Sequence, residues 1–371
     1  MIRVLHVMSG IGYQGGVQAL VWNYYKHINQ EEVRFDFIVH SNRMEGYEKR
    51  FLDRKSKIFY VPPKKEGLIQ NYREINKILK ENNYDIIHVH QDFLGYVALL
   101  AAKKCNIKVR IMHSHKANMI ESLFKRIIRW CFTSLCVNLA TDLFACGKEA
   151  AIWTYGLRRY EEGQVYILNN AIEEKEYLFD NNVRKEVRLK YGFSNKTVIG
   201  NVARFTYQKN QELLIDILEK LVKINSNYLL VLIGDGELLD SVKEKVSVKG
   251  LEQSVVFLGA KDNVNELLQG MDIFILTSRF EGLPVTMVEA QTADLPCIIS
   301  DNITHEIDIN KKTKYVKLDD ALEIWCDAII KSSCCGRANM QREVDESGFN
   351  IEKESEKLVN YYKKRVLNSY E

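Results

Sequence analysis

Two glutamates, Glu281 and Glu289, are separated by seven residues, and a Gly-Leu-Pro segment lies between them. Pro284 suits the first position of a helix, which places Glu281 in the preceding loop and Glu289 on the second helical turn. Amides at a helix N-terminus bind phosphate, and carboxylates accept hydrogen bonds from hydroxyl groups. The segment therefore suits a ligand with both phosphate and sugar hydroxyls, although the spacing alone equally allows Glu281 to serve only the helix dipole.

A pair of cations follows another apolar strand. Arg204 closes the strand expected over 197–202, and Lys209 directly precedes the helix expected over 211–224. Cations at one strand end stabilise the negative charge that develops on a departing pyrophosphate. The pair therefore indicates a diphosphate leaving group.

The first strand runs into a glycine-rich turn, Gly10-Ile11-Gly12-Tyr13-Gln14-Gly15-Gly16, which fits the G-x-G-x-x-G pattern of dinucleotide sites. In such sites an acid closes the second strand and holds a ribose, yet here that strand ends in His40 and Asp36 lies in its middle. We therefore do not expect NAD. The glycines still allow backbone amides to approach a phosphate, and a tight turn without a ligand is the alternative.

Four histidines lie near the ends of two further strands: His88, His90, His113 and His115. At the carboxyl edge of a parallel sheet such residues face the ligand crevice, while His88, inside its strand, is expected to be structural. Histidines two residues apart on a strand, with no acid cluster nearby, form a weak metal site. We expect no bound metal.

The elements that must position these residues form two series of alternating strands and helices. Strands are expected at 3–8, 33–40, 57–61, 86–90, 108–113, 143–146 and 165–168, then at 197–202, 228–233, 255–258, 273–276, 297–300 and 315–316. Helices are expected at 16–28, 47–55, 68–82, 93–105, 117–140 and 148–155, then at 211–224, 237–245, 286–293 and 354–369. Strands that are apolar on both faces and alternate with helices predict an α/β fold with parallel sheets.

The polar stretch 171–196 separates the two series and is expected to be a linker. The prediction is two Rossmann-like doubly wound domains facing a central cleft, over residues 1–170 and 171–353. A C-terminal helix over 354–371 is expected to pack back toward the N-terminal domain. Ligands should bind in the cleft, at the strands' carboxyl ends.

Composition limits the class of protein. The 371 residues are 46% hydrophobic and 27% charged with only 4 Pro, which excludes a mostly disordered chain. No run approaches the roughly 18 apolar residues of a membrane-spanning helix, and the N-terminus reads as a strand and not a secretory signal. Eight cysteines without a C-x-x-C pattern predict free thiols. We expect a cytoplasmic protein.

Charge is distributed unevenly along the chain. Residues 1–170 hold 25 Lys and Arg against 16 Asp and Glu, whereas the remainder holds 27 against 33. The stretch 117–137 combines apolar residues with a cluster of cations, Lys125, Arg126 and Arg129. It suits peripheral contact with an anionic membrane, and a helix that merely covers the N-terminal sheet is the alternative.

Taken in the order in which they occur along the chain, the motifs resemble those of the GT-B retaining glycosyltransferases of family 4, and especially of the members that make capsular or exopolysaccharide repeat units. The matching pieces are Gly15-Gly16, His113, Asn170-Ala171-Ile172, the R-x4-K pair, the turn at 234–236 and the E-x7-E motif with its Gly-Leu-Pro. The linker departs from the usual Pro-Asn-Gly, and the segment 301–306 lacks the glycine that commonly follows the motif. The resemblance spans almost the whole chain.

The resemblance implies a GT-B fold with an N-terminal acceptor-binding and a C-terminal nucleotide-sugar-binding domain. It assigns Arg204 and Lys209 to the donor diphosphate, Glu289 to the ribose, Glu281 and His113 to the transferred sugar. Further donor contacts are implied for Gly15, Gly16, Gly234, Gly282, Leu283, Pro284, Val285 and Thr286. It implies neither a cofactor nor a divalent metal.

The expected reaction is transfer of a hexose from a nucleoside diphosphate sugar, with UDP favoured, to a saccharide or polyprenyl-linked acceptor, with retention at the anomeric carbon. The protein is expected in the cytoplasm, either free or peripherally bound to the inner face of the cell membrane, and no nucleic acid partner is expected. One alternative is a nucleotide-sugar 2-epimerase of the same fold. The other is a non-catalytic scaffold that binds sugar nucleotides.

Overall fold

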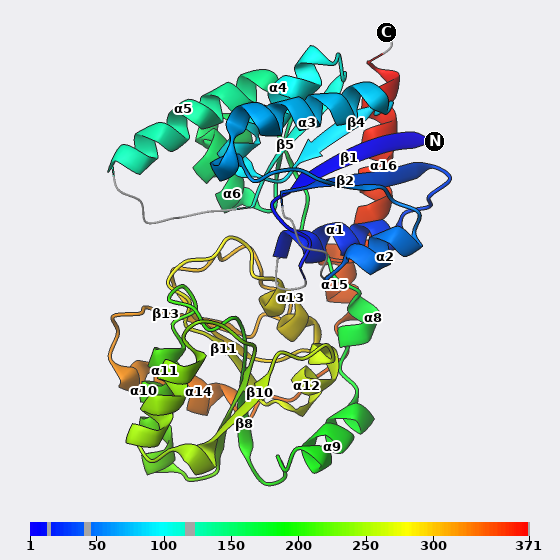
Figure 1. Ribbon diagram of the computed structural model, residues 1–371. Helices are drawn as coiled ribbons and strands as arrows, with labels where there is room; N and C mark the ends of the chain where they lie inside the picture. Colours follow the sequence, from blue (N-terminus) through cyan, green and yellow to red (C-terminus); the bar gives the residue numbers. More distant parts are fainter. Residues whose placement is uncertain (13–15, 41–45, 116–122, 370–371) are drawn as a thin grey trace. The chain divides into compact units, whose positions relative to one another are not determined.

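The structure is a computed structural model that describes residues 1–12, 16–40, 46–115 and 123–369, and the chain forms two compact units (Figure 1). Unit 1 comprises Met1–Ala171 and Asn350–Glu371, and unit 2 comprises Ile172–Phe349. Each unit is built on one parallel sheet with helices on both faces. Within the described residues no helix is both long and apolar enough to span a membrane.

The sheet of unit 1 has the strand order β3-β2-β1-β4-β5-β6-β7. Its strands are β1 (Ile2–Met8), β2 (Val33–Val39), β3 (Ile58–Tyr60), β4 (Ile86–Val89), β5 (Val109–Ser114), β6 (Asp142–Ala145) and β7 (Val165–Ile167). The chain builds the sheet in one direction from β1 to β3 and in the other from β4 onward. The reversal between β1 and β4 is the switch point at which such sheets bind ligands.

The helices of unit 1 are α1 (Gly16–His27), α2 (Glu48–Asp53), α3 (Leu68–Glu81), α4 (Tyr96–Lys104), α5 (Leu123–Leu139), α6 (Lys148–Tyr155), α7 (Leu157–Glu161) and α16 (Ile351–Leu367). On one face of the sheet, Leu5 and Ile87 pack with the buried residues of α3 and α4. On the other face, Val4 and Phe35 pack with α1 and α16. The two faces are both apolar because both are covered.

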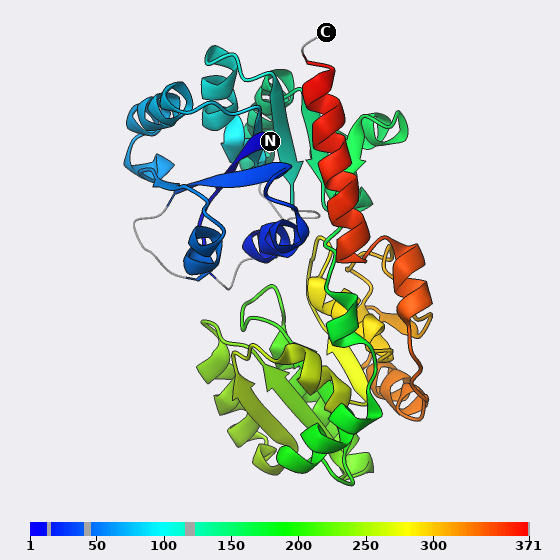
Figure 2. The ribbon, with the colours of Figure 1, turned by 90° about the vertical axis from the view of Figure 1, so that its right-hand side faces the viewer.

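Helix α16, at the end of the chain, is part of unit 1 and lies against α1 and β1 (Figure 2). Its buried residues Ile351, Leu358 and Tyr362 belong to the same core cluster as β1 and β2. Asn350 caps the helix by accepting a hydrogen bond from the amide of Lys353. The first strand of the chain is therefore covered by its last helix.

The sheet of unit 2 has the order β10-β9-β8-β11-β12-β13, so its switch point lies between β8 and β11. The strands are β8 (Thr197–Val202), β9 (Tyr228–Ile233), β10 (Val255–Gly259), β11 (Ile273–Leu276), β12 (Cys297–Ser300) and β13 (Thr313–Val316). The helices are α8 (Glu174–Tyr177), α9 (Asn181–Lys190), α10 (Gln211–Ile224), α11 (Leu239–Val248), α12 (Val264–Gly270), α13 (Val285–Thr292), α14 (Leu322–Ser332) and α15 (Gln341–Ser347).

The expected strands are all present, within two residues at either end. Helix α4 begins at Tyr96 and not at residue 93, because the chain from Asp92 to Gly95 forms a 3₁₀ turn. Of the long helix expected over 117–140, residues 123–139 form α5, and residues 116–122 lie outside the described part of the chain. Helices α7, α8, α9, α12, α14 and α15 were not expected.

The expectation of a linker over 171–196 is wrong. This stretch forms α8 and α9, and Val187 and Phe193 lie in the core of unit 2. Two arginines of α9 bind Asp272: Arg184 forms an ion pair with it, and Arg188 lies 3.1 Å away. Two arginines of this polar stretch are thus neutralised by a partner more than eighty residues away in sequence.

Candidate active site

The loops that follow β8 and β11 are tied together at the switch point of unit 2. The side chain of Asn210 donates to the carbonyl of Thr277, and the Thr277 hydroxyl donates back to the carbonyl of Asn210 at 2.9 Å. The amide of Arg279 donates to the carbonyl of Gln208 at 2.8 Å. These bonds hold the segment that carries Lys209 beside the segment that carries Glu281.

Glu281 is 7% exposed and forms an ion pair with Lys209. Its carboxylate also accepts hydrogen bonds from Ser278 Oγ at 2.8 Å and from Gln208 Nε2 at 3.1 Å. A buried carboxylate is stable only when it is paired and hydrogen-bonded, and this one has three partners. The structure therefore brings together two of the residues that were predicted from separate motifs.

Glu289 lies on the second turn of α13, as expected, and is partly buried. Tyr177, on α8, donates a hydrogen bond to its Oε1 at 2.9 Å. Burial raises the pKa of Glu289 to about 7, and the bond from Tyr177 opposes that rise. The carboxyl group therefore keeps its proton to a higher pH than an exposed glutamate does.

The segment between the two glutamates forms the start of α13. Pro284 is the N-cap and Val285 the first helical residue, which corrects the prediction that Pro284 opens the helix. Pro284 has an extended ψ of 114°, so the helix begins at the residue that follows it. Leu283 is buried in the core of unit 2, whereas Gly282, Val285 and Thr286 are partly exposed.

The Gly234-Asp235-Gly236 turn follows β9 and packs on the segment after β8. Gly234 has φ +142°, and a Cβ there would lie 2.0 Å from the carbonyl oxygen of Ala203. Gly236 has φ +154° and leaves no room beside the backbone of Phe205. The turn therefore fixes the backbone on which Arg204 stands. The Arg204 residue is exposed, and only its carbonyl, which accepts from Gln211, is tied into this loop.

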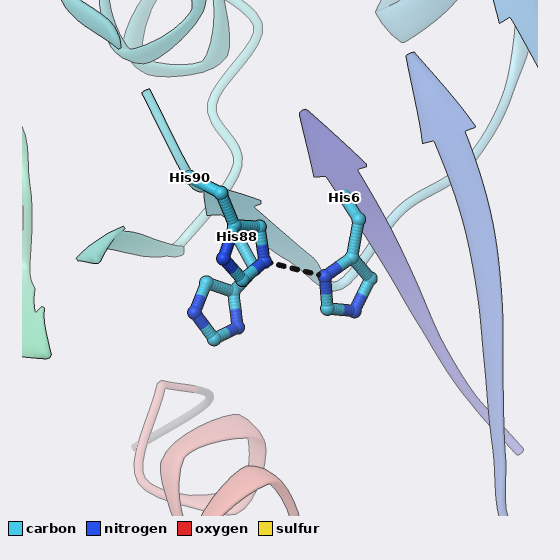
Figure 3. Close-up of side chains that lie close together, drawn as sticks. All are labelled: His6, His88 and His90. Atoms are coloured by element: carbon cyan, nitrogen blue, oxygen red, sulfur yellow. Dashed lines mark hydrogen bonds between the residues drawn. The ribbon is translucent and has the colours of Figure 1, made fainter. Parts of the chain in front are cut away.

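The switch point of unit 1 holds a cluster of histidines. His6 on β1 stands in register with His88 on β4, and His90 follows β4 directly. Figure 3 shows these three side chains, with His6 Nδ1 and His90 Nε2 2.9 Å apart. His113 and His115, from the end of β5, extend the cluster: His88 Nε2 lies 3.0 Å from His113 Nδ1, and His90 Nδ1 2.9 Å from His115 Nε2.

Burial keeps four of these imidazoles neutral. It lowers the pKa of His6 to about 3, and it lowers the pKa values of His88, His90 and His113 well below the ordinary value, with the neighbouring histidines adding to the effect for these three. His113 is completely buried, and its Nε2 has no hydrogen-bond partner among the described residues. His88, which we expected to be structural, is bonded at both ring nitrogens.

The same cluster is where the described residues gather nitrogen atoms that are close enough for a metal ion. The groups His6–His88–His90 and His90–His113–His115 each have ligand atoms within 4.8 Å of one another. Sequence reasoning missed His6, because it lies inside the first strand. The sequence did contain a clue to His6: it lies two residues before the end of its strand, and a neighbouring strand also carries histidines near its end.

Two further predictions concern the N-terminal strands. Gly16 is the first residue of α1, and Gly15 lies outside the described residues. Asp36 is buried within β2, where it binds Arg3 Nη2 at 2.9 Å and accepts a bond from the Tyr84 hydroxyl. It is committed inside the sheet and is unavailable to a ribose.

Comparison with known proteins identifies the family. Residues 14–176 match the model of "Glycosyltransferase Family 4", and residues 183–321 match "Glycosyl transferases group 1". A relative in Bacillus subtilis, the putative glycosyltransferase EpsF, is 31% identical, and the alignment covers 97% of this chain and 96% of that one. The chain belongs to glycosyltransferase family 4.

Other members are similar over the full length. The Staphylococcus aureus capsular polysaccharide biosynthesis glycosyltransferase CapH is 23% identical, with 99% of this chain and 100% of that one covered. The structure of Anabaena Alr3699/HepE in complex with UDP superposes with a TM-score of 0.72 at 18% identity, over 100% and 99% of the two chains. The predicted α/β class, the GT-B fold and the resemblance to polysaccharide glycosyltransferases are confirmed.

Proposed function

We propose that this family 4 glycosyltransferase transfers a hexose from a UDP-sugar to a saccharide acceptor in cell-surface polysaccharide synthesis, with retention at the anomeric carbon and without a metal ion. The observation that carries the proposal is the hydrogen-bonded Lys209–Glu281 pair at the switch point of unit 2, directly before α13. A cation, a carboxylate and helix amides at one strand edge suit a substrate that contains both phosphate and hydroxyl groups.

Each donor-binding role follows from the chemistry of its residue. Arg204 and Lys209 stabilise the departing diphosphate, while Glu289 accepts hydrogen bonds from the ribose hydroxyls. Glu281 contacts the transferred sugar, and the amides of residues 282–286 bind sugar and phosphate. In unit 1, Gly16 contributes to diphosphate binding, and His113 hydrogen-bonds the sugar near the reacting carbon.

Arg204, which is exposed, and Lys209, which is paired with Glu281, differ in the hydrogen-bond donors that they present to a diphosphate. The Lys209 ammonium has three donors, of which Glu281 uses one, so it can bind a phosphate oxygen without leaving the carboxylate. Arg204 is exposed and offers a planar fork to two phosphate oxygens. Together they supply the positive charge that a divalent metal would otherwise provide.

We assign a polyprenyl-linked acceptor to a groove of about 610 Å³ between α5 and α6. Its lining includes the cations Arg126, Arg129 and Arg159 together with Trp130 and Trp153. Cations suit a diphosphate and aromatic rings suit a lipid chain. An Escherichia coli relative, 23% identical over 99% of this chain, carries the name UDP-Gal:alpha-D-GlcNAc-diphosphoundecaprenol alpha-1,3-galactosyltransferase, which supports this acceptor class.

The same helix supports peripheral binding to an anionic membrane. Phe124 is 71% and Trp130 68% exposed, and Leu123 and Ile127 are also exposed beside Arg126. Apolar side chains and cations on one exposed surface are typical of helices that lie on lipid. Part of α5 also contacts α4 and β5, so the helix covers the sheet as well.

Sedimentation with phosphatidylglycerol vesicles tests the membrane assignment. The wild type should pellet at low salt and less at 1 M salt, where the Debye length falls from about 10 Å at 0.1 M to about 3 Å. The double variant Arg126→Glu/Arg129→Glu should stay in solution, whereas Lys77→Glu/Lys80→Glu on α3 carries the same charge change and should pellet. Equal sedimentation of the two variants contradicts the assignment.

Calorimetric titration with UDP-sugars tests the donor site. Arg204→Ala and Glu289→Ala should each weaken donor binding at least tenfold, because each removes charge-assisted hydrogen bonds. Glu281→Ala should mostly reduce turnover. Glu244→Ala, an exposed carboxylate on α11, is the matched control. Unchanged affinity in both Arg204→Ala and Glu289→Ala contradicts the site.

Incubation with the sugar nucleotide alone separates the two alternatives from transfer. A nucleotide-sugar 2-epimerase converts its substrate without an acceptor, and a non-catalytic scaffold binds the nucleotide and releases nothing. A transferase converts the donor rapidly only when the acceptor is present. Product formation that does not depend on an acceptor would favour the epimerase.

A further inference from the structure

A line of hydrogen bonds runs through unit 1 from the C-terminal helix to His113. The Tyr362 hydroxyl, on α16, lies 2.7 Å from His88 Nδ1, and His88 Nε2 lies 3.0 Å from His113 Nδ1. All three side chains are at most 1% exposed. At the far end of the line, His113 Nε2 is buried and has no partner among the described residues.

Donor counting gives this line a direction. Burial holds both imidazoles neutral, so each carries a single N–H. Among the described residues, the buried Tyr362 hydroxyl makes one hydrogen bond, to His88 Nδ1, so its O–H is best satisfied by donating there. The opposite direction would leave the Tyr362 hydrogen unbonded inside the protein, whereas this direction leaves unbonded only the hydrogen on His113 Nε2, which a ligand oxygen can accept.

Once Tyr362 donates to His88 Nδ1, the other protons follow. His88 must carry its hydrogen on Nε2, which donates to His113 Nδ1. His113 Nδ1 is then an acceptor, so the hydrogen of His113 lies on Nε2. The reverse direction would leave the Tyr362 hydrogen without an acceptor and would present a bare lone pair at His113 Nε2.

We propose that Tyr362 and His88 are positioning residues that fix His113 in the tautomer with its hydrogen on Nε2, so that His113 acts as a hydrogen-bond donor. A donor at this nitrogen suits a sugar hydroxyl or ring oxygen and not a cation. The inference rests on the proposed function for the role of His113 in turnover, but the tautomer itself does not depend on that role. It also gives the last helix of the chain a part in a site made by the first sheet.

The experiment compares Tyr362→Phe with Tyr361→Phe. Both residues lie on α16, and the Tyr361 hydroxyl also donates a hydrogen bond, to Asp142 Oδ1 at 2.6 Å, so the control loses a similar bond outside the line. The direct readout is the ¹⁵N spectrum of histidine-labelled protein, in which protonated and bare ring nitrogens have different shifts. The signals of His113 are assigned as those that His113→Gln loses.

The wild type should show His113 with hydrogen on Nε2 alone, and so should Tyr361→Phe. In Tyr362→Phe the His88 Nδ1 loses its donor, and His113 should populate both tautomers. Hydrogen on Nδ1 of His113 in the wild type, or an unchanged spectrum in Tyr362→Phe, overturns the proposal. Equal melting temperatures of the two phenylalanine variants show that the comparison is between folded proteins.

The kinetic readout is the release of UDP from the UDP-sugar that binds in a thermal-shift screen. Tyr362→Phe should lower kcat about tenfold with KM for the donor within twofold, whereas Tyr361→Phe should keep kcat within twofold. Inactive His113→Gln together with fully active Tyr362→Phe overturns the positioning role. Fully active His113→Gln instead contradicts the role of His113 in the proposed function, and the spectrum still decides the tautomer.

Discussion

The two sheets reverse their chain order in the same way, yet their switch points carry different chemistry. In unit 1 the strand ends bring together five histidines that are hydrogen-bonded to one another, and burial keeps four of them neutral. In unit 2 they bring together an ammonium and a carboxylate, with a second carboxyl group, Glu289, on the following helix. The hydrogen bonds of a neutral imidazole depend on which nitrogen carries the hydrogen. The interactions of a charged group depend on its partner and on the pH.

The difference between the two switch points shows that similar sheets can carry sites with different requirements for stability. A buried charge needs a partner of opposite sign, so the site of unit 2 is stable only as a set. A neutral imidazole needs only one donor and one acceptor, so histidines can line a strand edge without counter-ions. We expect substitutions at the charged site to cost more stability than substitutions among the histidines.

The largest effect is expected for Lys209→Ala. It leaves the buried Glu281 carboxylate without its counter-ion, and breaking a buried pair in this way costs about 3–5 kcal/mol. Urea denaturation should show this loss, and Lys209→Ala/Glu281→Gln should recover most of it. Lys223→Ala, which breaks the exposed pair with Glu219, should cost much less, because solvent screens that pair. A similar loss in both single variants would contradict the distinction between buried and exposed pairs.

Asp272→Ala should have the next largest effect. The variant removes the partner of Arg184 and Arg188, and we expect unit 2 to lose about 2–3 kcal/mol because α9 is no longer tied to the sheet. Compared with the wild type, the variant should show a larger increase in amide hydrogen exchange in α9 than in α5 of unit 1. Unchanged protection of α9 would mean that its apolar contacts alone hold it.

Glu289→Gln should change how stability depends on pH. Because the folded pKa of about 7 lies above the unfolded value near 4.3, the folded state binds more protons between these pH values, and wild-type stability falls as pH rises from about 4 to 7. The variant should therefore lack this slope, and its stability relative to the wild type should increase from pH 5 to pH 8. Thermal melts from pH 5 to pH 8 measure this. Parallel curves for the two proteins would contradict the raised pKa.

The smallest effect is expected from chelation. Within unit 2 no three potential metal ligands of the described residues lie close together, and in the proposed donor site Arg204 and Lys209 supply the charge for the diphosphate. UDP release should therefore stay within twofold in EDTA. A rate that falls with EDTA and returns with Mg²⁺ or Mn²⁺ would contradict the metal-free proposal, and one that returns only with Zn²⁺ would point to the histidines of unit 1.

Local patterns predicted the elements and the chemistry of several side chains. Apolar runs on both faces predicted the strands, and the Gly-Leu-Pro between two glutamates placed Glu289 on the second turn of a helix. The linker prediction failed because charge in 171–196 was taken as solvation, whereas Arg184 and Arg188 are bound by Asp272. Composition cannot distinguish a solvated arginine from a paired one.

The sequence by itself therefore determined the strands, the parallel sheets and the residue types at the strand ends, because these depend on periodicity over a few residues. Only the tertiary structure decided which residues meet. It paired Lys209 with Glu281 and joined Tyr177 to Glu289 by a hydrogen bond. It also brought His6 next to the other histidines and joined Tyr362 of the last helix to His88 by a hydrogen bond. Such contacts join residues that are up to 274 positions apart, and they depend on strand order and helix packing, which no local pattern encodes.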